Sequence, residues 1–373
     1  MVHSFYSSAQ PSGENTVVLN EVDALRRAGH EVALFAAHTD ELEGEVFYKL
    51  RAGMRVATGY GRNPLKAING FSPDVVHVHN LFPNYGRRWV ESLEVPVVHT
   101  LHNYRPICAN GLLFRDGEVC TRCPDGDGTA GLRFGCYRDS RLATLPLTIA
   151  NYGGPTRDPL LRRADRLLVL TDLQKHLYVK TGVPPERLQV HPNFLADEDA
   201  EPQGDASASS YVAVGRLSPE KGIRRLAEVW PACVELGIIG DGPDRAAIEA
   251  LGKPNIRLYG QLTHTATLEL VSRSQALIFP SLWFETFGLT ALEAWACSTP
   301  VVSTPGNTVE AMIRAHGGGI VSTWEELPDL VASAAFTEDD RAGARRAFEE
   351  HYTEDAYLRR AESLYRSLIS ETA

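Results

Sequence analysis

Short apolar segments alternate along this chain with longer amphipathic ones. In the first half, β-branched and other apolar runs bounded by Gly, Pro or Asp predict strands at Met1–Tyr6, His30–Ala36, Asp74–Val78, Val95–Thr100, Arg166–Leu170 and Arg187–Val190. Between them, a helical period predicts helices that include Thr16–Ala28 and Arg87–Leu93. Strands that alternate with helices in this way are typical of βα units around a parallel sheet.

The second half repeats the pattern. Strands are predicted at Tyr211–Val214, Leu236–Ile239, Ile256–Tyr259, Ala276–Phe279 and Pro300–Ser303, and helices at Ile223–Cys233 and Asp355–Ile369. Between the halves, Asp197–Ser210 is acidic and rich in small residues, which predicts a linker. Because 373 residues suit two domains of ordinary size, we expect two Rossmann-like α/β domains.

Composition is that of a soluble globular protein, with 43% apolar and 23% charged residues. No apolar run approaches the roughly 18 residues that a spanning helix needs. The first residues have neither a basic region nor a long apolar stretch, so they do not resemble a secretory signal. We therefore expect a cytoplasmic protein, with a place at the inner face of the membrane left open.

The net charge of −10 is unevenly distributed. Residues 1–195 carry 22 Lys/Arg against 20 Asp/Glu, and residues 196–373 carry 15 against 27. A first half that meets an anionic partner or a membrane surface would account for this asymmetry, and so would an ordinary difference between two domains. The sequence has no basic stripe strong enough to favour membrane binding over an ordinary difference between domains. We expect no nucleic-acid partner.

The segment Pro280–Val302 carries the strongest chemical signal. Its Glu285 and Glu293 stand eight positions apart where a predicted loop becomes a helix near Gly288. The free backbone N–H groups of residues 287–289 at such a helix start would suit a diphosphate, with one carboxylate to reach hydroxyls on either side. Two solvated acids flanking a buried helix are the alternative for an isolated pair of glutamates.

Two glycine-bounded loops strengthen the interpretation of this segment as a diphosphate-binding site. Val214–Gly222 places Arg216 and Lys221 between a strand and a helix, where two cations can converge on an anion. Either cation alone would more often be a surface residue. Gly240–Pro243 forms a second tight turn after a strand. Loops that follow strands gather at one edge of an open α/β sheet, so all three loops are expected in one crevice.

These motifs resemble those of glycosyltransferase family 4. In the second half the resemblance rests on GRLSPEKG, GDGP and FETFGLTALEA, and in the first on PSGEN, RRAGHEV, PDVVHVHN, HTLHN, ADRLLVLTD and VHPNFLAD, so it covers nearly the whole chain. The resemblance implies the GT-B architecture: two Rossmann-like domains facing each other across a cleft. It implies an acceptor-binding domain at 1–195, a donor-binding domain at 196–355, and a helix at 356–373 that crosses back to the first domain.

The resemblance also assigns roles in the second half. Arg216 and Lys221 would neutralise the diphosphate of the donor. Residues Phe287, Gly288 and Leu289 would contact it through the backbone, with Gly240 in the neighbouring turn. Glu293 would bind the ribose hydroxyls, and Glu285 would meet the donor sugar.

In the first half, the resemblance places His102 beside the sugar. Three further histidines, at 77, 79 and 99, compete for that role, and a histidine within a strand is more often structural. Gly13 matches a glycine loop that lets phosphates or acceptor approach. Members of the family often carry two glycines there, whereas this chain has Ser12 before Gly13, so the approach is expected to be slightly tighter.

Four cysteines fall within one glycine-rich insertion, at about residues 104–140. They are Cys108, Cys120, Cys123 and Cys136, and the middle pair forms a C-x2-C knuckle. Four thiolates could complete a structural zinc site. Buried reduced thiols or a redox-labile loop are the alternatives, because the outer pair is not a second knuckle.

The combined expectation is a retaining glycosyltransferase that uses a UDP- or GDP-linked sugar. The acceptor would be a carbohydrate, a glycolipid or a small molecule. No catalytic metal is expected, since Arg216, Lys221 and a helix start can carry the charge of the leaving group. A sugar-nucleotide epimerase and a non-catalytic nucleotide-sugar binding protein remain as alternatives.

Overall fold

The computed structural model describes residues 1–7, 13–196, 210–333 and 336–372. The chain forms two compact units. Unit 1 comprises Met1–Arg115, Cys120–Asn193 and Tyr357–Ala373, and unit 2 comprises Asp116–Val119 and Phe194–Ala356. The predicted linker Asp197–Ser210 lies outside the described residues except for its last residue, which begins a strand.

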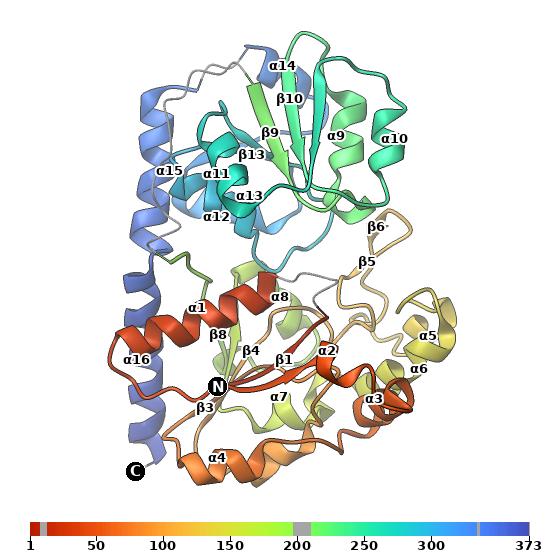
Figure 1. Ribbon diagram of the computed structural model, residues 1–373, viewed down its shortest axis with the longest axis vertical. Helices are drawn as coiled ribbons and strands as arrows, with labels where there is room; N and C mark the ends of the chain where they lie inside the picture. The colour runs from red at the N-terminus through yellow and green to blue at the C-terminus, as the bar shows by residue number, and fades with distance from the viewer. Residues whose placement is uncertain (8–12, 197–209, 334–335, 373) are drawn as a thin grey trace. The chain divides into compact units, whose positions relative to one another are not determined.

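Unit 1 is built on a six-stranded parallel sheet with the order β2-β1-β3-β4-β7-β8 (Figure 1). Its strands are β1 Val2–Phe5, β2 Phe35–His38, β3 Val76–Asn80, β4 Val97–Thr100, β7 Arg166–Val169 and β8 Leu188–Val190. The strand order reverses direction between β1 and β3, so the loops after these two strands diverge and leave room for side chains at the sheet edge.

The helices of unit 1 are mostly short. They are α1 Gly13–Arg27, α2 Thr39–Leu42, α3 Tyr48–Thr58, α4 Leu65–Phe71, α5 Ala130–Phe134, α6 Arg141–Asn151, α7 Pro159–Arg163 and α8 Asp172–Lys180, with 3-10 turns at Arg88–Ser92, Pro155–Arg157 and Pro185–Arg187. A two-stranded ladder of β5 Phe114–Arg115 and β6 Glu118–Val119 lies within the cysteine-bearing insertion.

The last helix, α16 Glu354–Thr372, joins unit 1 from Tyr357 onward. Its Leu364 and Leu368 pack in one buried cluster with Val98 of β4 and Leu168 of β7. The helix therefore contributes apolar side chains to the core of the first sheet.

Unit 2 contains the second six-stranded parallel sheet, in the order β11-β10-β9-β12-β13-β14. Its strands are β9 Ser210–Val214, β10 Glu235–Ile239, β11 Ile256–Gly260, β12 Leu277–Phe279, β13 Val301–Ser303 and β14 Gly319–Val321. Its helices are α9 Ile223–Val229, α10 Arg245–Glu249, α11 His264–Ser272, α12 Leu289–Ala296, α13 Thr308–His316, α14 Leu327–Ser333 and α15 Glu338–His351.

Three predicted elements differ most from the structure in their bounds or type. The second strand begins at Phe35, not His30, because the Phe35 N–H bonds to the Met1 carbonyl and the partner strand β1 starts only at Val2. The helix predicted to reach Cys233 ends at Val229, because Trp230 precedes a proline and is extended. The predicted helix Arg87–Leu93 is a 3-10 turn.

The strand β14 was not predicted from the sequence. Its residues, Gly319–Val321, include a glycine and are not buried, so they give no buried apolar run, and the strand pairs along β13. No helix of the described ranges is both long and apolar enough to cross a bilayer.

Candidate functional site

Three loops of unit 2 meet at the carboxyl ends of β9, β10 and β12. Strand β9 lies between the other two, and the chain runs outward from it in both directions. An open parallel sheet binds ligands where its strand order reverses in this way, because the loops on either side turn away from each other. The predicted donor residues of unit 2 therefore lie on loops or helix starts that such a site uses.

Lys221 and Glu285 form an ion pair across 64 positions of sequence. The Lys221 ammonium bonds to Oε1 of Glu285, and the Ser281 hydroxyl donates to its Oε2 over 2.8 Å. The Lys221 Nζ also lies 5.7 Å from the centre of the Trp283 ring. The Glu285 side chain is about 10% exposed and that of Lys221 about 26%, so the ammonium is the more accessible member of the pair.

Arg216 lies in the same loop as Lys221, and its side chain is exposed. The backbone beside it is held in place, because the Leu217 N–H bonds to the Asp241 carbonyl over 2.9 Å. Asp244 in turn donates its N–H to the Leu217 carbonyl over 2.9 Å. The loops after β9 and β10 are therefore tied together around an exposed guanidinium.

Two glycines allow these loops to approach each other. A Cβ at Gly222 would overlap the carbonyl oxygen of Pro280, and one at Gly240 would overlap the carbonyl oxygen of Gly215. Both residues have a positive φ, at 68° and 133°. The Leu282 N–H also bonds to the Glu220 carbonyl over 2.9 Å, which fastens the loop after β12 to the loop after β9.

The helix α12 begins at Leu289, directly after Gly288. No side chain caps this end, and Gly288 has a φ of 104°. A Cβ there would lie 2.6 Å from a methyl carbon of Val309, so the close packing of α13 requires glycine. The Phe287 side chain is buried, which leaves its backbone as the part available to a ligand. The helix start therefore presents N–H groups beside Glu285.

Glu293 lies one turn into α12. Its Oε1 is 3.1 Å from Nε2 of His264, the first residue of α11. His264 was not identified from the sequence, because a lone exposed histidine at a helix start carries no motif. The Glu293 side chain is 19% exposed, so the carboxylate remains open on one side.

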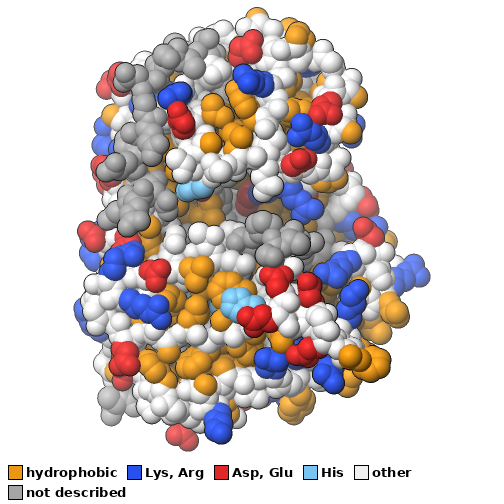
Figure 2. Space-filling model, viewed as in Figure 1, with side chains coloured by type: hydrophobic (Ala, Val, Ile, Leu, Met, Phe, Trp, Pro, Cys, Tyr) orange, Lys and Arg blue, Asp and Glu red, His pale blue; other side chains and the backbone are white. Residues whose placement is uncertain are grey.

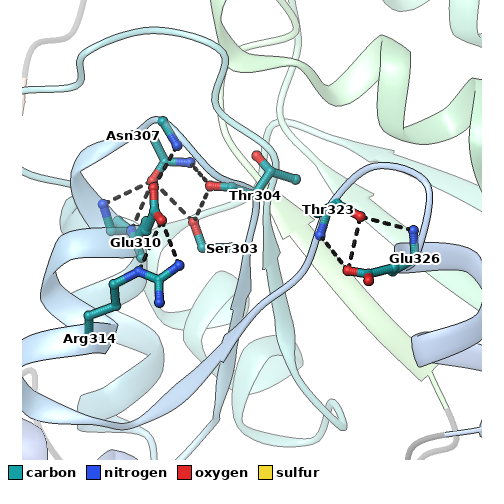
Figure 3. A network of polar contacts seen from close by, with 9 residues as sticks. Ser303, Thr304, Asn307, Glu310, Arg314, Thr323 and Glu326 are labelled. Atoms are coloured by element: carbon teal, nitrogen blue, oxygen red, sulfur yellow. Dashed lines mark hydrogen bonds and ion pairs between the residues drawn. The ribbon is translucent and has the colours of Figure 1, made fainter.

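A polar network centred on Asn307 lies at the start of α13 (Figure 3). The Asn307 side chain accepts from the N–H groups of Val309 and Glu310 and donates to the carbonyl oxygens of Thr304 and Ser281. The next residue, Thr308, donates its hydroxyl to the Glu285 carbonyl. These contacts link the start of α13 to both ends of the Ser281–Glu285 segment.

In unit 1, the predicted His102 lies at the wall of a small cavity of about 90 Å³. The cavity lies at the carboxyl ends of β3 and β4, and its polar lining includes His79, Asn80, Asn103 and Arg105. His102 is 9% exposed and bonds through Nε2 to Nδ1 of His79 over 3.0 Å. The histidines at 79 and 102, which the sequence presented as competitors, are thus hydrogen-bonded partners.

A buried chain of polar groups continues from His79 to α16. His79 Nε2 lies 3.7 Å from Oε2 of Glu21, and the Tyr357 hydroxyl bonds to that same oxygen over 2.8 Å. Beside it, His77 bonds through its two ring nitrogens to the hydroxyls of Tyr365 and Thr100, over 2.8 and 2.7 Å. The polar environment of His102 therefore extends through the sheet to the C-terminal helix.

Burial sets the protonation of this chain. It lowers the pKa of His77, His79 and His102 well below the ordinary value, so all three are neutral at neutral pH. It raises the pKa of Glu21 to about 8 against the opposing hydrogen bond from Tyr357. The Glu21 carboxyl is therefore mostly protonated at pH 7, and no buried charge accompanies the neutral histidines.

Glu14, near the start of α1, is a second carboxyl that sequence reasoning did not single out. Burial raises its pKa to about 7, although the Arg105 guanidinium and hydrogen bonds from Asn103 and Asn80 oppose the rise. It adjoins the predicted Gly13, which begins α1. Residues 11 and 12 of the PSGEN motif lie outside the described residues. Only its position beside Asn80, at the end of β3, and Asn103, in the loop after β4, distinguishes Glu14.

The stability of the protein should report the state of Glu21. From about pH 4.5 to about 8 the unfolded chain ionises this group while the folded state keeps its proton, so the free energy of unfolding falls as pH rises through that window. Glu21→Gln removes the titration and keeps a polar side chain for Tyr357. We expect the variant to match the wild type near pH 5 and to exceed it at pH 9 by on the order of a few kcal/mol.

Urea unfolding of both proteins at pH 5 and pH 9 measures this difference. The exposed Glu31→Gln is the matched control, and its unfolding curve should follow the wild type at both values. A Glu21→Gln effect of equal size at pH 5 and pH 9 would show that the titration of this carboxyl does not contribute.

The structure does not support the predicted zinc site. Within the described ranges, no three of Cys108, Cys120, Cys123 and Cys136 bring their sulfurs within 4.8 Å of one another. Burial raises the pKa of Cys108, and burial together with the neighbouring Cys108, Cys136 and Cys120 raises that of Cys123 to about 11. The Cys108 sulfur lies 2.9 Å from Oδ1 of Asn110, as a hydrogen-bonded thiol would.

One other set of side chains has metal-ligand spacing among the described residues. Glu21, His77 and His79 bring ligand atoms within 4.8 Å of one another, all buried. Both ring nitrogens of His77 are already hydrogen-bonded, and Glu21 holds a proton at neutral pH. Each of the three has a hydrogen-bond partner elsewhere in the core, namely Tyr357 for Glu21, Tyr365 and Thr100 for His77, and His102 for His79.

Comparison with known proteins identifies the family. The model described as Glycosyltransferase Family 4 matches residues 11–199, and the one described as Glycosyl transferases group 1 matches residues 200–353. A glycogen synthase of Mycobacterium tuberculosis (strain CDC 1551 / Oshkosh) is 36% identical over 146 residues, which are 36% of this chain and 34% of that protein. The match to this first curated relative thus spans about a third of its length.

A GDP-mannose-dependent alpha-mannosyltransferase of the same strain is 25% identical over 358 residues, covering 87% of this chain and 84% of that protein. Among solved structures, sucrose-phosphate synthase from Thermosynechococcus elongatus has a TM-score of 0.67 at 17% identity and covers 99% of this chain and 96% of its own. The likeness to that structure concerns the fold, which agrees with two parallel six-stranded sheets. The chain therefore belongs to glycosyltransferase family 4 and has the GT-B fold.

Proposed function

We propose that this protein is a retaining glycosyltransferase that moves a sugar from a UDP- or GDP-linked donor to an acceptor hydroxyl. The observation that carries the proposal is the meeting of Lys221, Glu285 and the Gly288 helix start at the ends of β9 and β12. Departure of a nucleoside diphosphate requires positive charge near the leaving oxygens, and fixed cations with backbone N–H groups supply it. The donor names of the full-length relatives support a nucleotide sugar.

Each donor contact in unit 2 has a distinct task. Arg216 and Lys221 bind the diphosphate, together with the backbone of residues 287–289. Gly240 keeps the turn after β10 clear of the loop that carries Arg216. Glu293 accepts from the ribose hydroxyls. Glu285 orients hydroxyls of the transferred sugar, with one of its oxygens fixed by Ser281.

Charge compensation by Arg216, Lys221 and the helix start makes a divalent metal unnecessary for the transfer. The bond from the anomeric carbon to the β-phosphate oxygen breaks while the acceptor oxygen bonds to the same face of that carbon. The acceptor proton passes to the departing phosphate oxygen, so no enzyme carboxylate has to act as nucleophile. Activity should persist in EDTA.

Unit 1 binds the acceptor in this proposal. His102 contributes to the sugar side, and its ring is oriented by His79. A second cavity of about 620 Å³, lined by Pro106, Cys123, Asp127, Tyr152 and Arg157 among others, has the volume of a small-molecule site and is the candidate for acceptor binding. Gly13 would allow the acceptor to approach the start of α1.

Donor screening tests the proposal. Thermal unfolding with UDP, GDP and their glucose, N-acetylglucosamine and mannose derivatives should identify one nucleotide class, because a ligand at 100 times its Kd adds about 2.7 kcal/mol of stability. The selected donor is then incubated with candidate acceptors, and NMR reads the anomeric configuration of the product. An inverted product, or a trapped glycosyl-enzyme, would contradict the proposed mechanism.

Incubation with the donor, without and then with acceptors, distinguishes a glycosyltransferase from an epimerase and from a non-catalytic binding protein. An epimerase would convert the sugar without acceptor, and a non-catalytic binding protein would bind the donor without releasing nucleotide when acceptors are supplied. A glycosyltransferase should release nucleoside diphosphate in proportion to glycosylated acceptor.

A further inference from the structure

The start of helix α11 lies at the same edge of the second sheet as the donor loops. Strand β11 runs parallel to β10 and ends at Gly260, and α11 begins at His264. Because parallel strands end at one edge of a sheet, the first turn of this helix lies at the edge that carries the loops after β9, β10 and β12. A fourth segment of unit 2 thus borders the candidate donor site, through a residue that no motif marked.

His264 contacts Glu293 at this edge. Helices α11 and α12 pack against each other, and Nε2 of the histidine lies 3.1 Å from Oε1 of the glutamate. A carboxylate only accepts hydrogen bonds, so the imidazole donates and carries a proton on Nε2. The ring therefore covers one side of the carboxylate and leaves the other side open.

The start of α11 holds this histidine in place. The Thr263 hydroxyl accepts from the Ala266 N–H over 3.3 Å and caps the helix. On the inner face of α11, Thr267, Leu268 and Val271 are buried. The ring of His264 is therefore carried by a capped and packed helix, which is the support that a side chain needs in order to orient another one.

Glu293 differs from Glu285 in the number of partners that hold it. Both oxygens of Glu285 are bound, one by Lys221 and the other by Ser281. In the described part of the chain, the Glu293 carboxylate is bonded to His264 at Oε1 and has no side-chain partner at Oε2. One oxygen is thus fixed by the protein, and the second is available to a ligand.

Surface charge around α11 does not select a ligand by itself. Figure 2 shows acidic and basic side chains interspersed over the face of unit 2 on which Figure 1 draws this helix. Recognition of a neutral diol, as in ribose, therefore depends on individual hydrogen bonds. A carboxylate that accepts from such a diol needs a fixed orientation, because the terminal torsion of a glutamate is otherwise broad.

We propose that His264 is a positioning residue of the ribose subsite. It donates from Nε2 to Oε1 of Glu293, so that the other carboxylate oxygen is oriented toward a hydroxyl of the ribose. The inference rests on the proposed function, which assigns Glu293 to the ribose hydroxyls. Fixing the glutamate before the nucleotide arrives removes part of the ordering cost of binding, so the histidine contributes to affinity without touching the ligand.

Two other roles for this pair lead to different predictions. An ordinary surface pair would contribute almost nothing to stability or to binding. A direct contact between the imidazole and the base or the diphosphate would strengthen the binding of every nucleotide equally, whether or not its ribose is complete. Only a role through Glu293 makes the contribution of His264 depend on a ribose hydroxyl.

Isothermal titration calorimetry of the full chain with UDP and GDP tests the proposal. The more tightly bound of the two is then compared with its 2′-deoxy and 3′-deoxy forms. Removing the hydroxyl that Glu293 binds should raise the Kd of the wild type about tenfold or more, and that of His264→Ala at most about twofold. With the complete ribose, His264→Ala should raise the Kd about five- to tenfold, and His264→Gln, whose amide can donate, should recover most of that loss.

Arg273→Ala is the matched control, because it removes from the same helix an exposed partner of a different carboxylate, that of Glu269. Its Kd should equal that of the wild type. Thermal unfolding without nucleotide should be the same for the His264 variants and the wild type, since the ring is half exposed.

The outcomes separate this role of His264 from the donor assignment. In His264→Ala, a rise in Kd by the same factor for complete and deoxy nucleotides, or no rise at all, would overturn the proposal and leave the donor site of unit 2 in place. If the wild type bound neither UDP nor GDP, the proposed function would fail, and the role of His264 with it.

Discussion

Lys221→Ala is expected to lower kcat/KM about 10²- to 10³-fold, equivalent to about 3–4 kcal/mol of transition-state stabilisation. Two losses add in this variant. The variant lacks a cation that we propose to lie beside the departing phosphate, and the buried Glu285 carboxylate loses its ionic partner. An uncompensated carboxylate next to a diphosphate opposes the growing negative charge, so the effect should exceed that of removing an exposed lysine.

Steady-state kinetics with the donor selected by thermal unfolding measure this effect. Arg273→Ala is the matched control, because it removes an exposed cation from α11 of the same unit, where it pairs with Glu269. Its kcat/KM should stay within about twofold of the wild type. The double variant Lys221→Ala with Glu285→Ala should lose less than the two single effects combined, since the residues act as a pair. Unchanged kinetics for Lys221→Ala would remove this residue from the donor site.

Gly222→Ala is expected to have the largest effect on stability. Its φ of 68° strains any L-residue, and the added methyl group would overlap the Pro280 carbonyl oxygen, which belongs to the backbone and cannot rotate away. The loop after β12 would have to separate from the loop after β9, breaking the Leu282–Glu220 hydrogen bond. We expect a loss of more than about 3 kcal/mol together with weaker nucleotide binding.

Gly252→Ala isolates the steric part of this loss. Gly252 has a similar φ of 60°, but no atom lies within 4 Å of its added Cβ. The control should lose only the backbone strain, about 1–2 kcal/mol, and keep nucleotide binding. Urea unfolding measures the loss of stability in both variants, and nucleotide titration measures their binding affinity. Equal losses at the two positions would mean that the contact with Pro280 does not constrain the loops.

The presence of most strands could be predicted from the sequence, but the residues at which they begin and end could be predicted less well. Buried parallel strands such as Val97–Thr100 and Leu277–Phe279 are apolar and β-branched runs. Their composition and the Gly, Pro or Asp residues that bound such runs therefore locate them. The start of β2 could not be predicted, because the residues that begin to pair are decided by where β1 begins. Strand β14 contains a glycine and is not buried, so it has no such apolar run.

In the candidate site, too, some features could be predicted from the sequence and others could not. Sequence motifs identified Lys221, Glu285 and Glu293 as candidates, because each motif consists of residues that are close together in the chain. No local pattern indicates that Lys221 and Glu285 form an ion pair, or that His79 bonds to His102 from the neighbouring strand. For the cysteines, sequence spacing suggested a zinc site, but in the described part of the chain no three of their sulfurs lie within 4.8 Å of one another.

The amino-acid pattern was enough to predict the alternating α/β architecture, the division into two halves and the loops that carry the donor motifs, because each of these depends on residues near one another in the chain. Which charges pair, and which carboxyls are buried enough to keep a proton, could be seen only in the folded chain. The same is true of which large apolar side chains remain exposed. These properties depend on contacts between distant segments, and burial, which sets both pKa and exposure, exists only after the chain has folded.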